Sequence, residues 1–160
     1  MFKLHTIGGF DRAINIPYCK LATGTDKVYN GNGVTIDRAQ ATATLTTAST
    51  GKADVWVVYN VIRGVYCGGT SDAYSTAGDF VNLYSLASLV GLEIEISNDA
   101  HTFASGPVSG LAAGDKLAYG ADGLLSKVSA DTGYAYVYKI IAINGDIIRA
   151  EVAAGTPAAD

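Results

Sequence analysis

The chain has 160 residues, of which 49% are apolar and only 16% are charged, and its net charge is −4. A chain of this length buries about 68–70% of its unfolded surface, so one domain can form without disulfides or metals. The acidic balance argues against nucleic acid, because phosphate neutralisation needs a clustered basic face. No apolar run reaches the ~18–20 residues that cross a bilayer, and the first residues lack the apolar core of a secretory signal. We therefore expect a protein made in the cytoplasm that contacts neither nucleic acid nor membrane.

Cysteine and histidine are too few and too scattered to indicate a redox or metal site. Cys19 and Cys67 lack a CxxC partner, so two buried thiols are favoured over a disulfide, although their pairing is left open. His5 and His101 show no metal-ligand spacing, and no nucleophile motif accompanies them. The sequence therefore predicts no catalytic residue, no metal site and no cofactor, and hence a protein that is not an enzyme.

The first 24 residues differ from the rest of the chain. Residues 8–18 mix isolated apolar side chains with glycine and proline, and they follow neither a helical nor a strand period. Both an arm that lies along another surface and an ordinary irregular lead-in have this pattern. We divide the chain into an arm or lead-in at 1–24, a β-rich domain at 25–152 and a loose tail at 153–160. A split of the domain into two subdomains near 100–110 is left open.

Strand signals begin after the arm. Val28–Tyr29 and Val34–Ile36 flank Asn30–Gly33, whose Asn-Gly pairs suit a tight hairpin turn. Residues 41–46 alternate small apolar side chains with threonine, which fits a pleated surface. The sequence therefore predicts a hairpin and a third strand in this part of the chain.

The next apolar run has no polar face. It covers residues 55–62 and predicts a central strand buried on both sides, with Trp56 as a core anchor. Residues 64–79 are rich in glycine, serine and aspartate and are typical of a loop. This loop separates the central strand from the second half of the chain.

Residues 80–90 fit the spacing of one short amphipathic helix. Two strands, over 80–84 and 89–96, are the alternative, because short apolar runs cannot be assigned by period alone. We favour the helix. The run that follows alternates cleanly, so Glu93 and Glu95 lie side by side on one strand face toward solvent or a partner. That placement does not suit the paired carboxylates of a glycosidase, which face each other across a cleft.

The last third of the chain predicts two hairpins. Residues 115–119 and 124–128 flank a four-residue connection rich in glycine. Residues 134–143 form a long strand, which Asn144–Gly145 turns into residues 146–152. Asn-Gly between two β-rich runs predicts a type I′ turn.

A row of tyrosines, Tyr134, Tyr136 and Tyr138, shares one face of the long strand. Such a row can be cross-strand packing, a protein interface or a stacking platform for a ligand, and packing is favoured over the interface. The number of strands and turns predicts an all-β fold. We expect a small antiparallel barrel or sandwich with an irregular N-terminal arm and at most one short helix.

Three segments of the last third follow a pattern found in one family. Val108–Val128 fits a hairpin of the form aGD-x-L-x-x-g-x-dG-x-x-x-x-v, Gly133–Val137 fits a G-x-A-x-x strand, and Gly145–Ile148 fits a closing G-D-x-I/V strand. Over residues 105–152 the chain resembles the head decoration proteins of tailed bacteriophages, also called cement or capsid-stabilising proteins. Residues 1–100 resemble them only in being rich in glycine, alanine and threonine and low in charge.

The resemblance implies a structural virion protein that binds the outer surface of an icosahedral phage capsid and stabilises the mature lattice. Its partners would be the major capsid protein and other copies of the chain, as a trimer or a dimer, and it would hold no cofactor. The N-terminal arm would pair with capsid elements by strand addition. Seven apolar residues of the arm are the candidate contacts: Phe2, Leu4, Ile7, Phe10, Ile14, Ile16 and Tyr18.

Two other functions stay open. One is another structural component of the virion, such as a tail or head-completion protein. The other is a carbohydrate- or receptor-binding β-module, with Trp56 or the tyrosines at 134–138 as the sugar platform. The low charge density favours an assembled component, because a free monomer usually carries more surface charge.

Overall fold

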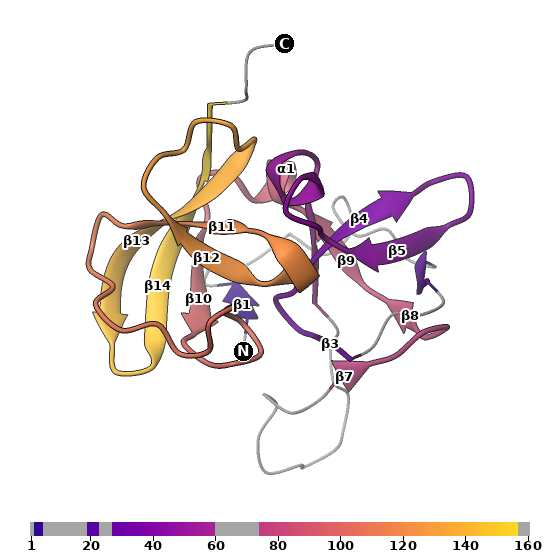
Figure 1. The fold of residues 1–160 in the computed structure, drawn as a ribbon, viewed down its shortest axis with the longest axis horizontal. Helices are drawn as coiled ribbons and strands as arrows, with labels where there is room; N and C mark the ends of the chain where they lie inside the picture. The colour runs from indigo at the N-terminus through magenta and orange to yellow at the C-terminus, as the bar shows by residue number, and fades with distance from the viewer. Residues whose placement is uncertain (1, 5–18, 23–26, 60–73, 157–160) are drawn as a thin grey trace.

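The computed structural model describes residues 2–4, 19–22, 27–59 and 74–156. It confirms an all-β fold, built from two six-stranded sheets and one small two-stranded sheet. One of the six-stranded sheets curls into a nearly closed barrel, and the other lies against it (Figure 1).

The barrel-like sheet, called the first sheet below, is antiparallel at every strand pair. Its strands in spatial order are β1 (Phe2–Leu4), β10 (Glu93–Ser97), β14 (Ile147–Ala154), β13 (Tyr136–Asn144), β11 (Lys116–Tyr119) and β12 (Leu125–Val128). The hairpins β11–β12 and β13–β14 occur where the sequence predicts them. Strand β1 forms one edge, where its residues Phe2 and Leu4 oppose Ile96 and Ile94 of β10.

The second sheet is built from the first half of the chain. Its strands in spatial order are β8 (Phe80–Val81), β2 (Cys19–Leu21), β5 (Thr42–Leu45), β4 (Gly33–Asp37), β6 (Trp56–Val58) and β9 (Leu83–Ser85). Only β2 and β5 run parallel. Because Cys19 and Leu21 are buried within this sheet, the strand at 19–21 belongs to the core and not to an arm.

The favoured helix over residues 80–90 is wrong for most of its length. Residues 80–81 and 83–85 are strands, and only α1 (Leu86–Leu89) is helical. Pairing with β6 takes the backbone of 83–85, because a partner strand in the core outweighs a weak local helical period. Gly91 follows the helix with a φ of 84°, the left-handed geometry that ends helices.

The predicted hairpin across residues 28–36 is also wrong. Val28–Tyr29 is strand β3, which pairs with β7 (Tyr74–Ser75) in the two-stranded sheet and not with β4. The Asn32 side-chain Oδ1 accepts the backbone N–H of Tyr29 at 2.8 Å, and the Asn32 backbone N–H donates to the Tyr29 carbonyl at 3.1 Å. These bonds close a turn that leads the chain into another sheet.

The last turn lies where the sequence predicts it but has another type. The loop between β13 and β14 is Gly145–Asp146, because Asn144 faces Ile147. Of these loop residues only Gly145 has a positive φ, 61°, which is the pattern of a type II′ turn and not type I′. Pairing of Ile143 with Ile148 sets this register, because a slip of one residue would turn buried side chains outward.

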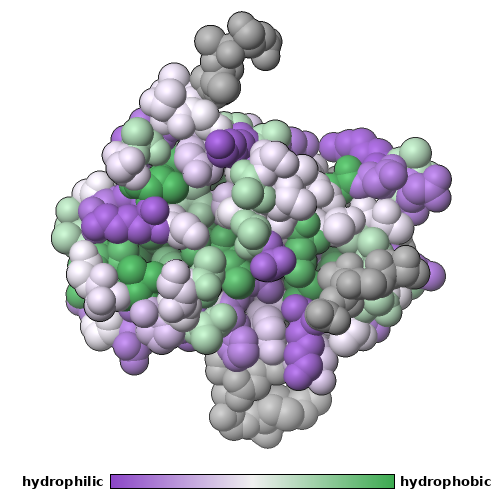
Figure 2. Space-filling model, viewed as in Figure 1, coloured by the Kyte–Doolittle hydropathy of each residue, from purple (hydrophilic) through white to green (hydrophobic). Residues whose placement is uncertain are grey.

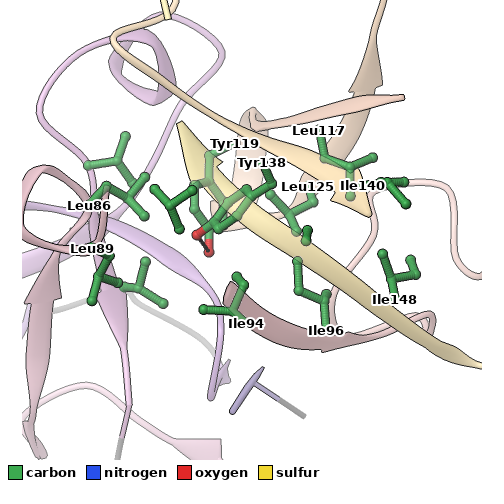
Figure 3. Packing of buried hydrophobic residues seen from close by; sticks show 14 of the residues in the cluster. Leu86, Leu89, Ile94, Ile96, Leu117, Tyr119, Leu125, Tyr138, Ile140 and Ile148 are labelled. Carbon is green, nitrogen blue, oxygen red and sulfur yellow. Dashed lines mark hydrogen bonds between the residues drawn. The ribbon is translucent and has the colours of Figure 1, made fainter. Parts of the chain in front are cut away.

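The two sheets share the largest buried cluster (Figure 3). The first sheet supplies most of it, and Val55, Val57 and Tyr84 come from the second sheet and its edge. On the other side of β6, Trp56 and Val58 belong to a second cluster. The prediction that this strand is central and buried on both sides is therefore confirmed for residues 56–58. Residues 60–62 lie outside the described part of the chain.

Backbone pairing extends into the C-terminal segment that the sequence predicts to be a loose tail. Strand β14 runs to Ala154, and Ala153 is buried. Beyond the strand, the Gly155 N–H donates to the Ala135 carbonyl at 2.8 Å, and Thr156 bridges Thr132. Residues 153–156 therefore belong to the domain.

Candidate interaction surfaces

Two of the seven predicted arm contacts lie in the described part of the chain. Phe2 and Leu4 belong to β1 at the edge of the first sheet. The other five lie outside the described residues: Ile7, Phe10, Ile14, Ile16 and Tyr18. The structure thus places the beginning of the chain on the barrel and leaves the arm contacts as a prediction.

The tyrosine row is not one exposed face. Tyr138 is 1% exposed in the largest cluster, and Tyr136 packs partly against that cluster. Tyr134 precedes β13 and packs against a small separate cluster around Val137, on the other face of the sheet. The favoured interpretation, packing, is therefore confirmed for Tyr138, and the interface alternative is wrong for this residue, because its side chain lies in the barrel interior.

Trp56 is the core anchor that the sequence predicts. It is 7% exposed, and its Nε1–H donates to an Asp54 carboxylate oxygen at 3.3 Å. The Arg38 guanidinium lies 5.7 Å from the ring centroid. An indole packed in this way offers no open ring face to a sugar.

The thiol and imidazole groups of the described chain do not form a reactive site. Cys19 is a free, buried thiol whose pKa is raised by burial, and Cys67 and His5 lie outside the described residues. The His101 ring stacks on Tyr29 with centroids 4.0 Å apart. Within the described ranges, no group of three His, Cys, Asp or Glu side chains is placed to hold a metal ion.

A buried chain of hydroxyls joins the barrel to the turn before β4. Tyr138 donates to the hydroxyl of Tyr119 at 3.0 Å (Figure 3). Tyr119 in turn donates to the Gly31 carbonyl at 2.6 Å. Burial raises the pKa of both tyrosines well above the usual range. The Gly33 backbone lies so close to the Tyr119 ring that a Cβ atom there would be 2.7 Å from it. These contacts fix the turn at 30–33 against the first sheet.

A buried amide holds the aromatic pair beside this turn. Asn32 is 2% exposed; its Nδ2 donates to the His101 carbonyl at 2.8 Å, and its Oδ1 accepts the Tyr29 N–H. The His101 N–H in turn donates to Asp99 Oδ1 at 3.0 Å. Hydrogen bonds to Asn32 and Asp99 therefore fix the backbones of Tyr29 and His101, and this positions their stacked rings.

Tyr74 extends this aromatic pair to the surface. It lies directly opposite Tyr29 in the β3–β7 pair, with ring centroids 5.9 Å apart. Its side chain is 49% exposed, and the Lys27 ammonium lies 4.5 Å from its ring centroid. An exposed aromatic ring with a lysine over it therefore lies at the end of a preorganised stack.

Phe80 forms a second contact of the same kind. It is 59% exposed on β8, an edge strand of the second sheet, and the Lys20 ammonium lies 4.8 Å from its ring centroid. The turn before it is closed by Asp79, whose carboxylate accepts the Thr76 N–H at 2.7 Å. Sequence reasoning missed both contacts, because each lysine and its ring are distant in the chain.

The outer face of the first sheet is charged and internally paired. Ile94 and Ile96 of β10 face the core and Glu93 and Glu95 face outward, as the alternation predicts. Glu93 Oε2 lies 2.8 Å from Nε of Arg149 on the neighbouring strand. Glu93 and Arg149 therefore neutralise each other within this face.

A cleft of about 370 Å³ lies between β12 and the loop at 105–109. Leu125, one of the lining residues, pairs with the segment at 102–104: its N–H donates to the Thr102 carbonyl, and its carbonyl accepts the Ala104 N–H. Lys127 is the one charged residue of the lining, and its ammonium lies 2.7 Å from Asp115. The lining offers neither a carboxylate pair nor an imidazole for catalysis.

The exposed apolar side chains of the described chain are few. On the face shown in Figure 2, apolar residues form separate patches divided by hydrophilic ones. Four large hydrophobic side chains are exposed, and two of them, Tyr74 and Phe80, lie within seven residues of sequence. None of the described helices is long and apolar enough to cross a bilayer.

Comparison of the chain with protein-family models, with curated proteins and with solved structures found no match.

Proposed function

We propose that the chain is a structural virion protein that binds the outer surface of an icosahedral phage capsid and stabilises the mature lattice. The major capsid protein is its partner, and the chain assembles with copies of itself. The resemblance at residues 105–152 carries this proposal.

The fold supports the proposal by giving the matching residues one structural context. The three matching segments build the hairpins β11–β12 and β13–β14, which are neighbours in one sheet. Four glycines of the pattern, at 114, 123, 133 and 145, have positive φ, between 61° and 92°, whereas Gly120 has a φ of −126°. The four positions with positive φ favour glycine, so these four matching letters coincide with backbone requirements and are not a matter of composition alone.

The carbohydrate-binding alternative has lost two of the four residues that suggested it. Both Trp56 and Tyr138 are buried in the core. An aromatic platform for sugar needs an exposed ring face, and these two rings have none. Tyr134 and Tyr136 are partly buried against two different clusters, so they do not form a common platform either, and the virion function is the one that we propose.

The test is co-sedimentation with capsids of the encoding phage, prepared without this chain in mature and in unexpanded form. We expect binding to mature shells only, at a fixed copy number per shell protein, and a raised temperature of shell disassembly, because a ligand of one lattice state stabilises that state. Absence of binding to both forms overturns the proposal. Binding to isolated tails or portal rings in place of shells assigns the chain to another virion component.

The arm is tested by substitution and not by removal of residues 2–18. Deletion would also remove β1, which pairs with β10. The triple variant Ile7→Ser, Phe10→Ser, Ile14→Ser keeps β1, and we expect it to lose capsid binding while its thermal unfolding stays unchanged. Full binding by this variant shows that the arm is not the contact.

A further inference from the structure

Four side chains on the second sheet and beside the β3–β7 pair combine aromatic and cationic groups. They are the rings of Tyr74 and Phe80 and the ammonium groups of Lys27 and Lys20 that lie over them, 4.5 and 4.8 Å from the centroids. Tyr74 is on β7, Phe80 on β8 and Lys20 on β2, and Lys27 directly precedes β3. Strands β3, β7 and β8 lie together at the lower right of Figure 1. We call these four residues the lysine–aromatic surface.

The two halves of this surface are close enough to contact one partner. Tyr74 and Phe80 are six residues apart, which limits the distance between their Cα atoms to about 22 Å. A standard interface of about 800 Å² per partner is about 30 Å across. One interface is therefore large enough to reach both rings.

The lysines of this surface differ from Lys116 and Lys127 of the first sheet. Lys116 and Lys127 lie 3.1 and 2.7 Å from a carboxylate. Within the described residues, neither Lys20 nor Lys27 has a carboxylate at ion-pair distance, and each is held over a ring. A lysine ordered in this way can pair with a carboxylate of a partner and loses less side-chain entropy on binding.

The aromatic part is preorganised. Tyr74 packs against Tyr29, which stacks on His101, and the buried Asn32 fixes the backbones of both. Tyrosine on a rigid support is typical of residues that dominate interface energetics. The surface therefore combines an ordered apolar contact with two positive charges, on a chain whose net charge is −4.

We propose that the lysine–aromatic surface docks onto an acidic patch of a protein, which under the function proposed above is the outer face of the capsid shell. The lysines pair with carboxylates of the shell, and the two rings pack on apolar atoms between them. This inference rests on the proposed function and names the residues of the domain, besides the arm, that contact the shell. A protein fits better than a nucleic acid, because two lysines are too few to follow a phosphate backbone.

The test compares capsid binding of Lys20→Gln/Lys27→Gln with that of Lys52→Gln/Lys139→Gln. Both pairs remove two exposed lysines and change the net charge equally, and Lys52 lies over a ring, that of Tyr134 at 5.7 Å. We expect the first pair to bind mature shells about tenfold more weakly and with a flatter dependence on NaCl concentration, because exposed charges across an interface are screened by salt. The control pair should bind as the wild type does.

Further variants separate charge from shape. Lys20→Arg/Lys27→Arg keeps the charge and should bind nearly as the wild type does. Phe80→Ser should weaken binding without changing thermal unfolding, because its ring is more than half exposed.

Each outcome decides between the two proposals. Absence of wild-type binding overturns the proposed function and this inference together. Wild-type binding that both lysine pairs leave unchanged overturns the inference alone. Equal weakening by both pairs shows a general charge effect and also overturns it, as does competition of DNA for the same lysines.

Discussion

In the first sheet three cationic side chains lie against carboxylates, whereas in the second two lie over aromatic rings. Lys116, Lys127 and Arg149 are 2.7 to 3.1 Å from a carboxylate oxygen. Lys20 and Arg38, on or beside strands of the second sheet, lie 4.8 and 5.7 Å from ring centroids. Two lysines do not follow this division: Lys139 of the first sheet is exposed, and Lys52 lies over the ring of Tyr134.

This contrast separates cations that are paired within the protein from cations that remain available to a partner. A carboxylate partner neutralises a lysine, so Lys116 and Lys127 have little charge left for another molecule. A ring orders a lysine without neutralising it. The second sheet and the β3–β7 pair therefore keep positive charge in a fixed position on an acidic chain.

The junction between the two regions is where substitution should have its largest effect. A Cβ atom on Gly123 would lie 2.6 Å from the Gly33 carbonyl oxygen, and its φ is 68°. Gly133 has a φ of 87° and open space around it. We expect Gly133→Ala to lower the free energy of unfolding by about 1 kcal/mol and Gly123→Ala by about 3 kcal/mol, because the second adds a clash with backbone to the same conformational cost.

Urea unfolding measures both variants, with two signals that also test the comparison. Trp56 is the single tryptophan and reports on the second sheet, whereas far-ultraviolet circular dichroism reports on both. Coincident transitions in the wild type show that the sheets unfold together. Separate transitions would show that the shared cluster does not couple them.

Substitutions in the hydroxyl chain should have the next largest effect on stability, and the two tyrosines should differ in that effect. Tyr119→Phe leaves the buried Gly31 carbonyl without its donor and the Tyr138 hydroxyl without its acceptor, so we expect a loss of about 2 kcal/mol. Tyr138→Phe leaves the bond to Gly31 in place and should cost about 1 kcal/mol. Equal losses in chemical denaturation would mean that the bond to Gly31 adds nothing.

Alkaline pH should destabilise the fold through the same two tyrosines. Their pKa values are raised in the folded state, so the folded protein binds more protons than the unfolded chain above the ordinary tyrosine pKa of about 10. Their contribution is complete below that pH and is lost as the pH rises, by at most about 2.7 kcal/mol per pH unit for two groups. Tyrosinate absorbance should show these two titrating only with unfolding, and reversible titration in the folded protein would contradict their burial.

The smallest effects should come from the surface charges that distinguish the sheets. Glu93 and Arg149 are each 42% exposed, so Arg149→Gln should lower stability by less than about 1 kcal/mol, and by less at high salt. Arg38→Gln, which removes the contact with the Trp56 ring, should cost about 0.5 kcal/mol. Thermal unfolding at low and high NaCl compares them, and a larger loss in either variant would contradict the view that these contacts are peripheral.

Prediction from the sequence works best where the elements are local. The hairpins β11–β12 and β13–β14 follow from turn residues and strand periods within a few positions of each other. The hairpin across 28–36 and the helix over 80–90 fail, because distant partners take the backbone of those segments: β7 for Val28–Tyr29 and β6 for Leu83–Ser85. The candidate surface shows the same limit, since Lys20 and Phe80 are 60 positions apart in the sequence and meet only through pairing of β2 with β8.

The sequence by itself determined the class of fold, the buried central strand at Trp56 and the two C-terminal hairpins. Those features depend on the alternation of apolar residues and on glycine at turns, which act over a few residues. Only the tertiary structure decided that Tyr138 faces the core, that β2 joins the second sheet and that two lysines lie over exposed rings. These depend on which strands pair, and pairing is chosen by burial summed over the whole domain.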